Sequence, residues 1–261
     1  MELAAIALAP GLAVGSFLNV VAARIPLRRS IVKPGSACMS CETPLRWYDN
    51  VPVFSYFMLR GKCRHCGASI SWRYPAVEAT TAVLIAACAL KFGLHWEFAI
   101  AAVFCAVLVA VSATDLERRI IPNGVVLPAT VILLAAQTIL HPSVQWIAGG
   151  LGASLFFLLA ALAYPGGMGM GDVKLALLLG VVLGKTVPVA LFAGMIAALV
   201  PSAVLISRHG TKARKMAIPF GPFLALGGVL ALFAGQVILV WYLGVLYWRR
   251  RAICKSLLTF G

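Results

Sequence analysis

The fold class can be read from residues 98–114, whose sequence FAIAAVFCAVLVAVSAT contains no charged side chain. A bilayer core about 30 Å thick needs about 20 apolar residues of helix, so this stretch predicts a membrane crossing. The whole chain has the same character, since 62% of its 261 residues are hydrophobic and 11% are charged, against about 25% charged residues in a soluble domain. The composition therefore excludes a soluble globular enzyme and a disordered protein.

Further apolar stretches accompany this one along the chain. They cover residues 3–23, 76–92, 124–140, 145–164, 173–184, 186–206 and 220–247. We expect an all-α polytopic membrane protein of about eight transmembrane helices, with seven or nine as the alternatives. In this division residues 1–23 form the first transmembrane helix, 24–75 a polar cytoplasmic insert, 76–248 the transmembrane core and 249–261 a basic C-terminal tail.

The basic residues test this division, because cytoplasmic loops of membrane proteins carry an excess of Lys and Arg. The chain has 22 basic and 8 acidic side chains, a net charge of +14. With residues 24–75 in the cytoplasm, most basic residues fall on the cytoplasmic side, while Lys91 and Lys185 fall outside. The distribution of the basic residues therefore indicates how the helices are oriented in the membrane. It does not indicate a nucleic-acid partner, and we expect none. The basic tail would lie outside after eight crossings. We expect the orientation to be set by the earlier helices and not by the charges of this tail.

The insert carries two CxxC pairs, Cys38 with Cys41 and Cys63 with Cys66. Each pair presents two thiolates from one tight turn, so the two pairs can supply the four tetrahedral ligands of a zinc ion. An insert of about 50 residues has little core of its own, so the metal would contribute much of its folding free energy. We expect a structural zinc site in a zinc-ribbon-like insert. Two redox or disulfide-forming pairs are the alternative.

Two of the three aspartates lie at membrane boundaries. Asp115 follows the stretch at 98–114 and Asp172 precedes the stretch at 173–184, so both lie at cytoplasmic helix ends in the expected topology. Carboxylates that are kept near hydrocarbon are usually functional. Two that approach closely share one proton, so the ionised partner can activate water while the protonated partner polarises a scissile carbonyl. We expect Asp115 and Asp172 to face each other in this way.

Simpler interpretations apply to several of these residues. An Asp in the first turn of a helix can cap it, which is the alternative for Asp172, whereas a negative charge at the C-terminal end of a helix, as at Asp115, is unfavourable. Asp49 in the insert and Glu117 after Asp115 are expected to be solvated charges. The glycines at 166–171 could let a substrate backbone approach closely. No strand precedes them, as a nucleotide-binding loop would require.

Several short motifs carry a family resemblance. They are GSFLNVV at 15–21 with RIP at 24–26, the four cysteines, YP at 74–75 with Glu78, Asp115 with IP at 121–122, GMGD at 169–172 with Lys174, and IPFGPFLA at 218–225. Together they resemble the type IV prepilin peptidases, the leader peptidases and N-methyltransferases of type IV pilus and type II secretion systems. The GMGD motif is also similar to that of the presenilin-type intramembrane proteases.

The resemblance implies a bifunctional enzyme of the bacterial inner membrane with its active site at the cytoplasmic face. Such an enzyme cleaves the leader of prepilins or pseudopilins after a Gly, and methylates the new N-terminal amine with S-adenosylmethionine as donor. The resemblance also implies that Asp115 and Asp172 are the catalytic pair. The family positions of Asn19 and Glu78 make them candidates for donor binding or methyl transfer, and an interhelical hydrogen bond is their simpler interpretation.

Two other classes of protein share some of these features. A proton-coupled transporter could use Asp115 and Asp172 as a relay, but it predicts buried charges near the bilayer midplane and internal repeats. A non-catalytic membrane scaffold would need only the four cysteines. The aspartates at helix ends and the ordered motifs favour the peptidase over both.

Overall fold

The computed structural model describes the backbone of residues 2–164, 167–210 and 218–258, and side chains as far as residue 245 with the exception of His209. Within these ranges the chain forms α-helices and short 3₁₀ turns, with two isolated β-bridges in the insert. The helices are α1 (Glu2–Arg24), α2 (Phe54–Met58), α3 (Arg73–Phe92), α4 (Trp96–Arg118), α5 (Asn123–Leu140), α6 (Gln145–Ala163), α7 (Met170–Leu183), α8 (Val187–His209) and α9 (Gly221–Leu258).

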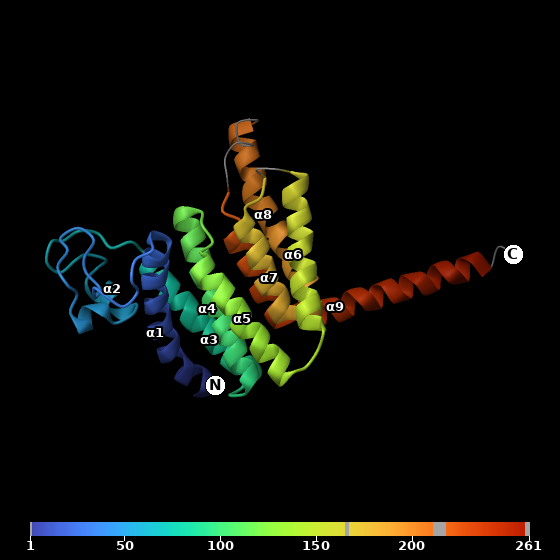
Figure 1. Ribbon diagram of the computed structural model, residues 1–261, viewed down its shortest axis with the longest axis horizontal. Coiled ribbons are helices and arrows are strands. Elements are labelled where there is room, and N and C mark those ends of the chain that lie inside the picture. The colour runs from blue at the N-terminus through green and yellow to red at the C-terminus, as the bar shows by residue number, and fades with distance from the viewer. Residues whose placement is uncertain (1, 165–166, 211–217, 259–261) are drawn as a thin grey trace.

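The expected polytopic architecture is confirmed. In the described part of the chain, 7 helical stretches are long and apolar enough to cross a membrane. The longest of them, Met170–Arg208, is interrupted by a 3₁₀ turn at Gly184–Thr186, where Gly184 has a φ of +53°. This turn separates α7 from α8, which Figure 1 shows as two distinct rods. The bundle therefore contains eight apolar helices, as the separate stretches 173–184 and 186–206 predict.

Helices α4 and α7 form the centre of the bundle. α4 packs against α1, α3, α5 and α9, and α7 packs against α5, α6, α8 and α9. Leu175, Leu178 and Leu179 on α7 have no exposed surface. A helix of 14 residues is only about 21 Å long, which is short for a crossing. α7 tolerates this length because its neighbours, and not lipid, surround it.

Glycines let the helix backbones touch at three packing interfaces. A Cβ atom at Gly180 of α7 would lie 2.1 Å from the carbonyl oxygen of Gly149 on α6, and one at Gly227 of α9 would lie 2.1 Å from the carbonyl oxygen of Ala190 on α8. A Cβ at Gly15 of α1 would lie 2.6 Å from the Cα of Glu78 on α3. Small residues at such contacts are how helices associate in lipid, where no hydrophobic effect draws them together.

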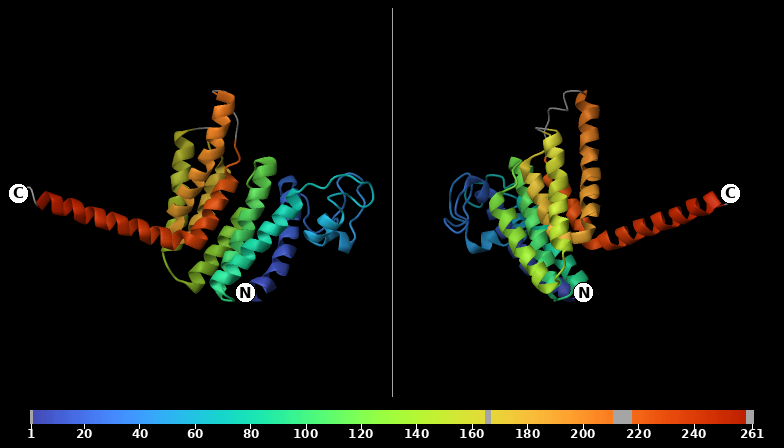
Figure 2. Two further views of the ribbon diagram at one scale, coloured as in Figure 1. Left: turned by 180° about the vertical axis from the view of Figure 1, so that it is seen from behind. Right: turned by 45° about the vertical axis from the view of Figure 1, so that its right-hand side comes forward.

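The last helix extends well beyond the apolar stretch at 220–247. Its first part packs in the bundle, and its later part runs out sideways, away from the other helices (Figure 2). The side chains after Gly235 are mostly exposed. Lys91 of α3 donates from Nζ to the carbonyl oxygens of Leu232 (2.7 Å) and Phe233 (2.6 Å), and so holds α9 just before that point. The backbone of residues 249–258 continues the same helix.

Candidate functional site

The two CxxC segments fold into matching turns. Cys38 donates from its backbone N–H to Thr43, and Cys63 donates in the same way to Ala68. The carbonyl oxygens of the same two cysteines accept the N–H groups of Glu42 and Gly67, which both have a positive φ. Each turn therefore aims its two thiols to one side.

The four thiols meet at one point between the turns. The Sγ atoms of Cys38, Cys41, Cys63 and Cys66 all lie within 4.8 Å of one another, and those of Cys38 and Cys66 are 3.8 Å apart. Tetrahedral zinc with Zn–S bonds of about 2.3 Å requires sulfurs about 3.8 Å apart. None of the four is in a disulfide. The spacing fits a metal better than two redox pairs.

The protonation chemistry of the cluster agrees with a cation site. Hydrogen bonds from backbone amides lower the pKa of Cys38 and Cys63, and bonds with Thr43 lower the pKa of Cys41. The backbone amide of Ala68 also lowers the pKa of Cys66, but desolvation and the three neighbouring thiols outweigh it and raise that pKa to about 11. Four thiolates in one place repel each other, so a bound dication is what allows all four to ionise.

Polar side chains join the insert to the bundle. Glu78, which is buried on α3, accepts the backbone N–H of Val53 at 2.7 Å. Asn19 of α1 donates from Nδ2 to the carbonyl oxygen of Tyr74 at 3.1 Å and to Glu78 Oε1 at 3.5 Å. The structure therefore brings Asn19 and Glu78 together, and their interhelical hydrogen bond is present.

A cavity of about 410 Å³ lies between the insert, α1 and α3. Its lining includes Asn19, Tyr56, Arg64, Tyr74 and Glu78, and none of its lining residues comes from α4 or from any later helix. One cavity residue corrects the sequence analysis. Asp49 is not a solvated charge: it is buried and accepts two hydrogen bonds from Arg64, at 2.9 and 2.8 Å, which make its burial tolerable.

Asp115 lies outside this cavity, near the C-terminal end of α4. It is 6% exposed, and its Oδ2 accepts the backbone N–H of Gly221 at 2.9 Å. Gly221 is the first residue of α9. The unfavourable position of a carboxylate at one helix C-terminus is therefore offset by the positive N-terminal end of a second helix.

Asp172 lies in the first turn of α7 and is partly buried. Asp115 is near enough to act on Asp172 electrostatically, so the fold brings the two aspartates into one neighbourhood. The N-cap of α7 is Gly169, whose backbone N–H bonds to the carboxylate of Asp172 in the first turn. The capping interpretation of Asp172 therefore applies beside the catalytic one.

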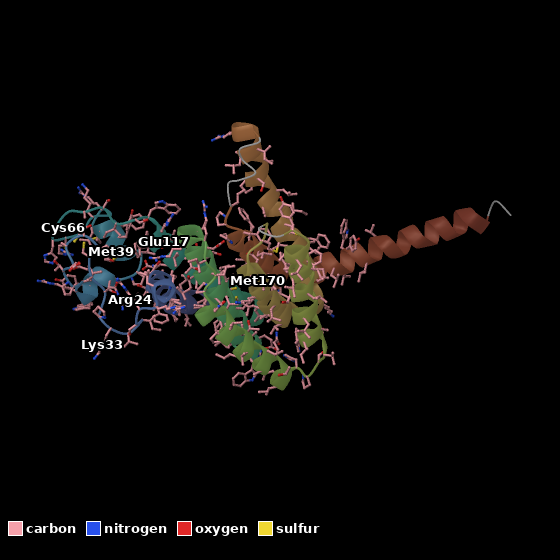
Figure 3. The ribbon with its side chains drawn as sticks, turned by 45° about the horizontal axis from the view of Figure 1, so that its top comes forward. Arg24, Lys33, Met39, Cys66, Glu117 and Met170 are labelled. Carbon is pink, nitrogen blue, oxygen red and sulfur yellow. The ribbon has the colours of Figure 1, made fainter. Side chains whose placement is uncertain are left out.

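Two contacts beside Asp172 join α7 to α5 and to the segment before it. A Cβ atom at Gly171 would lie 2.9 Å from the Cβ of Ile121, so this glycine allows α7 to pack on the segment before α5. Lys174 donates from Nζ to Asn123 Oδ1 at 2.9 Å and so ties α7 to the start of α5. Figure 3 labels Glu117 of α4 and Met170 of α7, together with Arg24 at the end of α1 and Met39 and Cys66 in the insert at the left.

Gly221 is the functional residue that sequence reasoning missed. It stands in the motif at 218–225, but it has no side chain to suggest chemistry. Only its backbone N–H contacts Asp115, and that contact depends on the packing of α9.

Two family models match this chain, one on each side of the connection between α3 and α4. The cavity lies within the first match and the two aspartates lie within the second. Residues 10–92 match the family model described as the bacterial peptidase A24 N-terminal domain, and residues 102–203 match that of the type IV leader peptidase family. No solved structure gives a significant match.

Three similar proteins carry the name prepilin leader peptidase/N-methyltransferase. One from Bacillus subtilis (strain 168) is 38% identical, over 89% of this chain and 95% of that protein. One from Myxococcus xanthus (strain DK1622) is 48% identical over 45% of this chain and 35% of that protein. One from Xanthomonas campestris pv. campestris is 33% identical over 89% and 92%.

The cysteine geometry predicts one zinc ion per chain. Metal analysis of the purified protein should give about one equivalent of zinc, and Cys63→Ser should remove most of it, because three ligands no longer complete the tetrahedral shell. Cys88→Ala is the matched control, since Cys88 is a fully buried cysteine on α3, outside the cluster. Clearly less than one equivalent in the unchanged protein would contradict the zinc site.

Proposed function

The chain belongs to the type IV leader peptidase family, and on that premise we propose that Asp115 and Asp172 are the catalytic pair of its peptidase activity. The protein is a polytopic membrane enzyme that cleaves prepilin leader peptides and N-methylates the product, as the names of its relatives describe. The observation that carries the proposal is the hydrogen bond from Gly221 to Asp115 beside Asp172.

On the basis of this hydrogen bond we propose different roles for the two aspartates. The N–H of Gly221 and the N-terminal end of α9 both favour a negative charge on Asp115. Asp115 therefore accepts a proton from water as the water oxygen attacks the scissile carbonyl carbon. Asp172 holds the shared proton and donates it to the carbonyl oxygen. Collapse of the tetrahedral intermediate breaks the C–N bond, and the leaving amine takes up a proton from the pair.

The position of the pair suits a substrate that is partly in the membrane. Asp115 lies in the last turn of α4 and Asp172 in the first turn of α7, and the excess of basic residues in the adjoining loops favours a cytoplasmic location for these ends. We propose cleavage after a Gly at the cytoplasmic face of the bacterial inner membrane, where a basic leader stays in the cytoplasm and the apolar helix of a prepilin or pseudopilin lies in the bilayer. A transporter relay is not favoured, because the aspartates lie at helix ends.

We propose a division of the chain that separates the two sites. Residues 24–75 form the insert, whose four cysteines would hold a structural zinc ion with no open position for catalysis. Residues 76–248 form the transmembrane core with the aspartates, preceded by the helix at 1–23 and followed by the basic residues of 249–261.

The cavity beside the insert is the proposed site of the methyl donor, S-adenosylmethionine. Its volume of about 410 Å³ is within the usual range of ligand pockets, about 300–1,000 Å³. The donor carries a positive sulfonium and an ammonium group, which suit the carboxylate of Glu78, and an adenine ring, which suits Tyr56 and Tyr74. Asn19 would hold Glu78 in place through the hydrogen bond between them.

Methyl transfer at this cavity gives Glu78 a second role. Glu78 would remove a proton from the new N-terminal ammonium of the pilin. The lone pair of the free amine then forms the N–C bond while the S–C bond of the donor breaks, and the electron pair of that bond stays on sulfur. Because no α4 or α7 residue lines the cavity, cleavage and methylation take place at separate sites.

Removing either carboxylate of the pair should abolish leader cleavage. Asp115→Asn and Asp172→Asn should each lower the cleavage rate at least about 100-fold, because general acid–base catalysis is lost. Cleavage of a purified prepilin in proteoliposomes measures the effect. Glu117→Gln is the control, since Glu117 is an exposed carboxylate on the same helix end. Normal cleavage by either Asp→Asn variant would rule out the proposed pair.

Replacing Gly221 tests whether its contact with Asp115 positions that carboxylate for cleavage. A Cβ atom at this position would lie 2.9 Å from Asp115 Oδ2, so Gly221→Ala should displace the carboxylate and lower cleavage about 100-fold. Gly124→Ala is the control, because a Cβ there meets only Ile25 Cγ2 at 3.7 Å. Since the donor cavity is separate, donor binding should stay unchanged. Equal cleavage by the two alanine variants would show that the contact is unimportant.

Neutralising Glu78 should weaken donor binding without affecting cleavage. Glu78→Gln keeps an oxygen that can accept the Val53 N–H but removes the charge that faces the donor, so affinity for labelled S-adenosylmethionine should fall about tenfold. Equilibrium binding to the purified protein is the measurement. Glu42→Gln, at an exposed carboxylate of the same insert, should bind normally. If Glu78→Gln binds as well as the unchanged protein, Glu78 only joins the insert to α3.

A further inference from the structure

The short helix α2 of the insert exposes three large apolar side chains. Phe54, Phe57 and Met58 are 62%, 69% and 67% exposed. They stand at positions i, i+3 and i+4, so they share one side of the helix, which we call the α2 face. Tyr56 points elsewhere, because it lines the cavity and lies against Gly61. A face of this kind in water would be costly, so something apolar covers it.

The position of α2 along the bundle indicates what covers it. Val53, which directly precedes α2, bonds to Glu78, and Glu78 lies five residues, or about 7.5 Å, beyond the start of α3. Asn19, which bonds to the same carboxylate, lies five residues before the end of α1. The helix α2 therefore begins beside membrane-spanning segments of α1 and α3. Figures 1 and 2 show the insert at the side of α1 and not stacked over the bundle.

The rest of the insert has the chemistry of a membrane interface. Trp47 and Trp72 are largely exposed, and tryptophan is enriched at the level of lipid headgroups. Arg60 and Lys62, exposed just after α2, can meet lipid phosphates. Residues 24–73 contain nine basic side chains against two acidic ones, Glu42 and Asp49. Such a surface is attracted to anionic lipid.

We propose that the α2 face is buried in the lipid leaflet on the insert side of the membrane, so that the insert rests on the bilayer as an interfacial anchor. The apolar side chains enter the boundary between headgroups and acyl chains, and the basic residues contact the phosphates. This anchor is independent of the reactions proposed above. It would hold the cavity at the membrane surface, where the amine of a membrane-embedded product emerges.

Lipid photo-crosslinking tests the anchor in the full-length protein. p-Benzoylphenylalanine is placed at Phe57, and the protein is irradiated in nanodiscs of phosphatidylethanolamine and phosphatidylglycerol. Mass spectrometry should detect lipid adducts at this position. Leu90, an exposed apolar residue of the transmembrane helix α3, is the positive control. Tyr56, on the same turn but facing the cavity, should give protein adducts and no lipid adducts.

Three results would overturn the proposal. They are lipid adducts at Leu90 but none at Phe57, equal lipid adducts at Tyr56 and Phe57, or crosslinks from Phe57 to a second copy of the protein in place of lipid. The same measurement at Met58, the next residue of the α2 face, makes the test independent of a single position. Zinc content of each variant confirms that the insert is folded.

Discussion

A polar group inside this bundle must find its partner within the protein, because the hydrocarbon of a bilayer offers none. At several polar positions the structure meets this constraint with backbone groups. Gln137 donates to the carbonyl oxygen of Val182, and Lys91 donates to two carbonyl oxygens of α9. The carboxylates of Glu78 and Asp115 accept backbone N–H groups from Val53 and Gly221. Each of these bonds joins segments that are distant in the sequence, so the pairing of polar groups also determines the tertiary arrangement.

The same bonds place two kinds of chemistry in two parts of the molecule. Glu78 joins the insert to α1 and α3, and the cavity opens between these three elements. Asp115 joins α4 to α9, next to the first turn of α7. The two family models divide the chain between α3 and α4, which is the boundary between these two sites. In the proposed sequence of reactions a product passes from the aspartates to the cavity, and both would act on the same side of the membrane.

Much of this arrangement could be predicted from local sequence, and the failures share one cause. Hydropathy located the helices and CxxC spacing located the cysteine cluster. The scarcity of acidic residues, together with the motifs, indicated Asp115 and Asp172. The solvated state expected for Asp49 was wrong, because Arg64 lies fifteen residues further along the chain and pairs with it only after the insert folds. The bend of α9 away from the bundle could not be predicted either, since residues 220–247 read as one continuous apolar stretch.

Local sequence is therefore enough to identify the apolar helices, an insert with four cysteines suited to zinc, and two carboxylates at helix ends. These properties depend on composition and on spacing within short segments, which are local. The contacts between these groups depend on how the helices pack. The tertiary structure brought the N–H of Gly221 to Asp115, set Gly171 against Ile121 and enclosed the cavity around Glu78. These contacts involve backbone atoms and glycines, which have no side chain. A local stretch of sequence does not show what such groups contact, because their partners are brought together only when the helices pack.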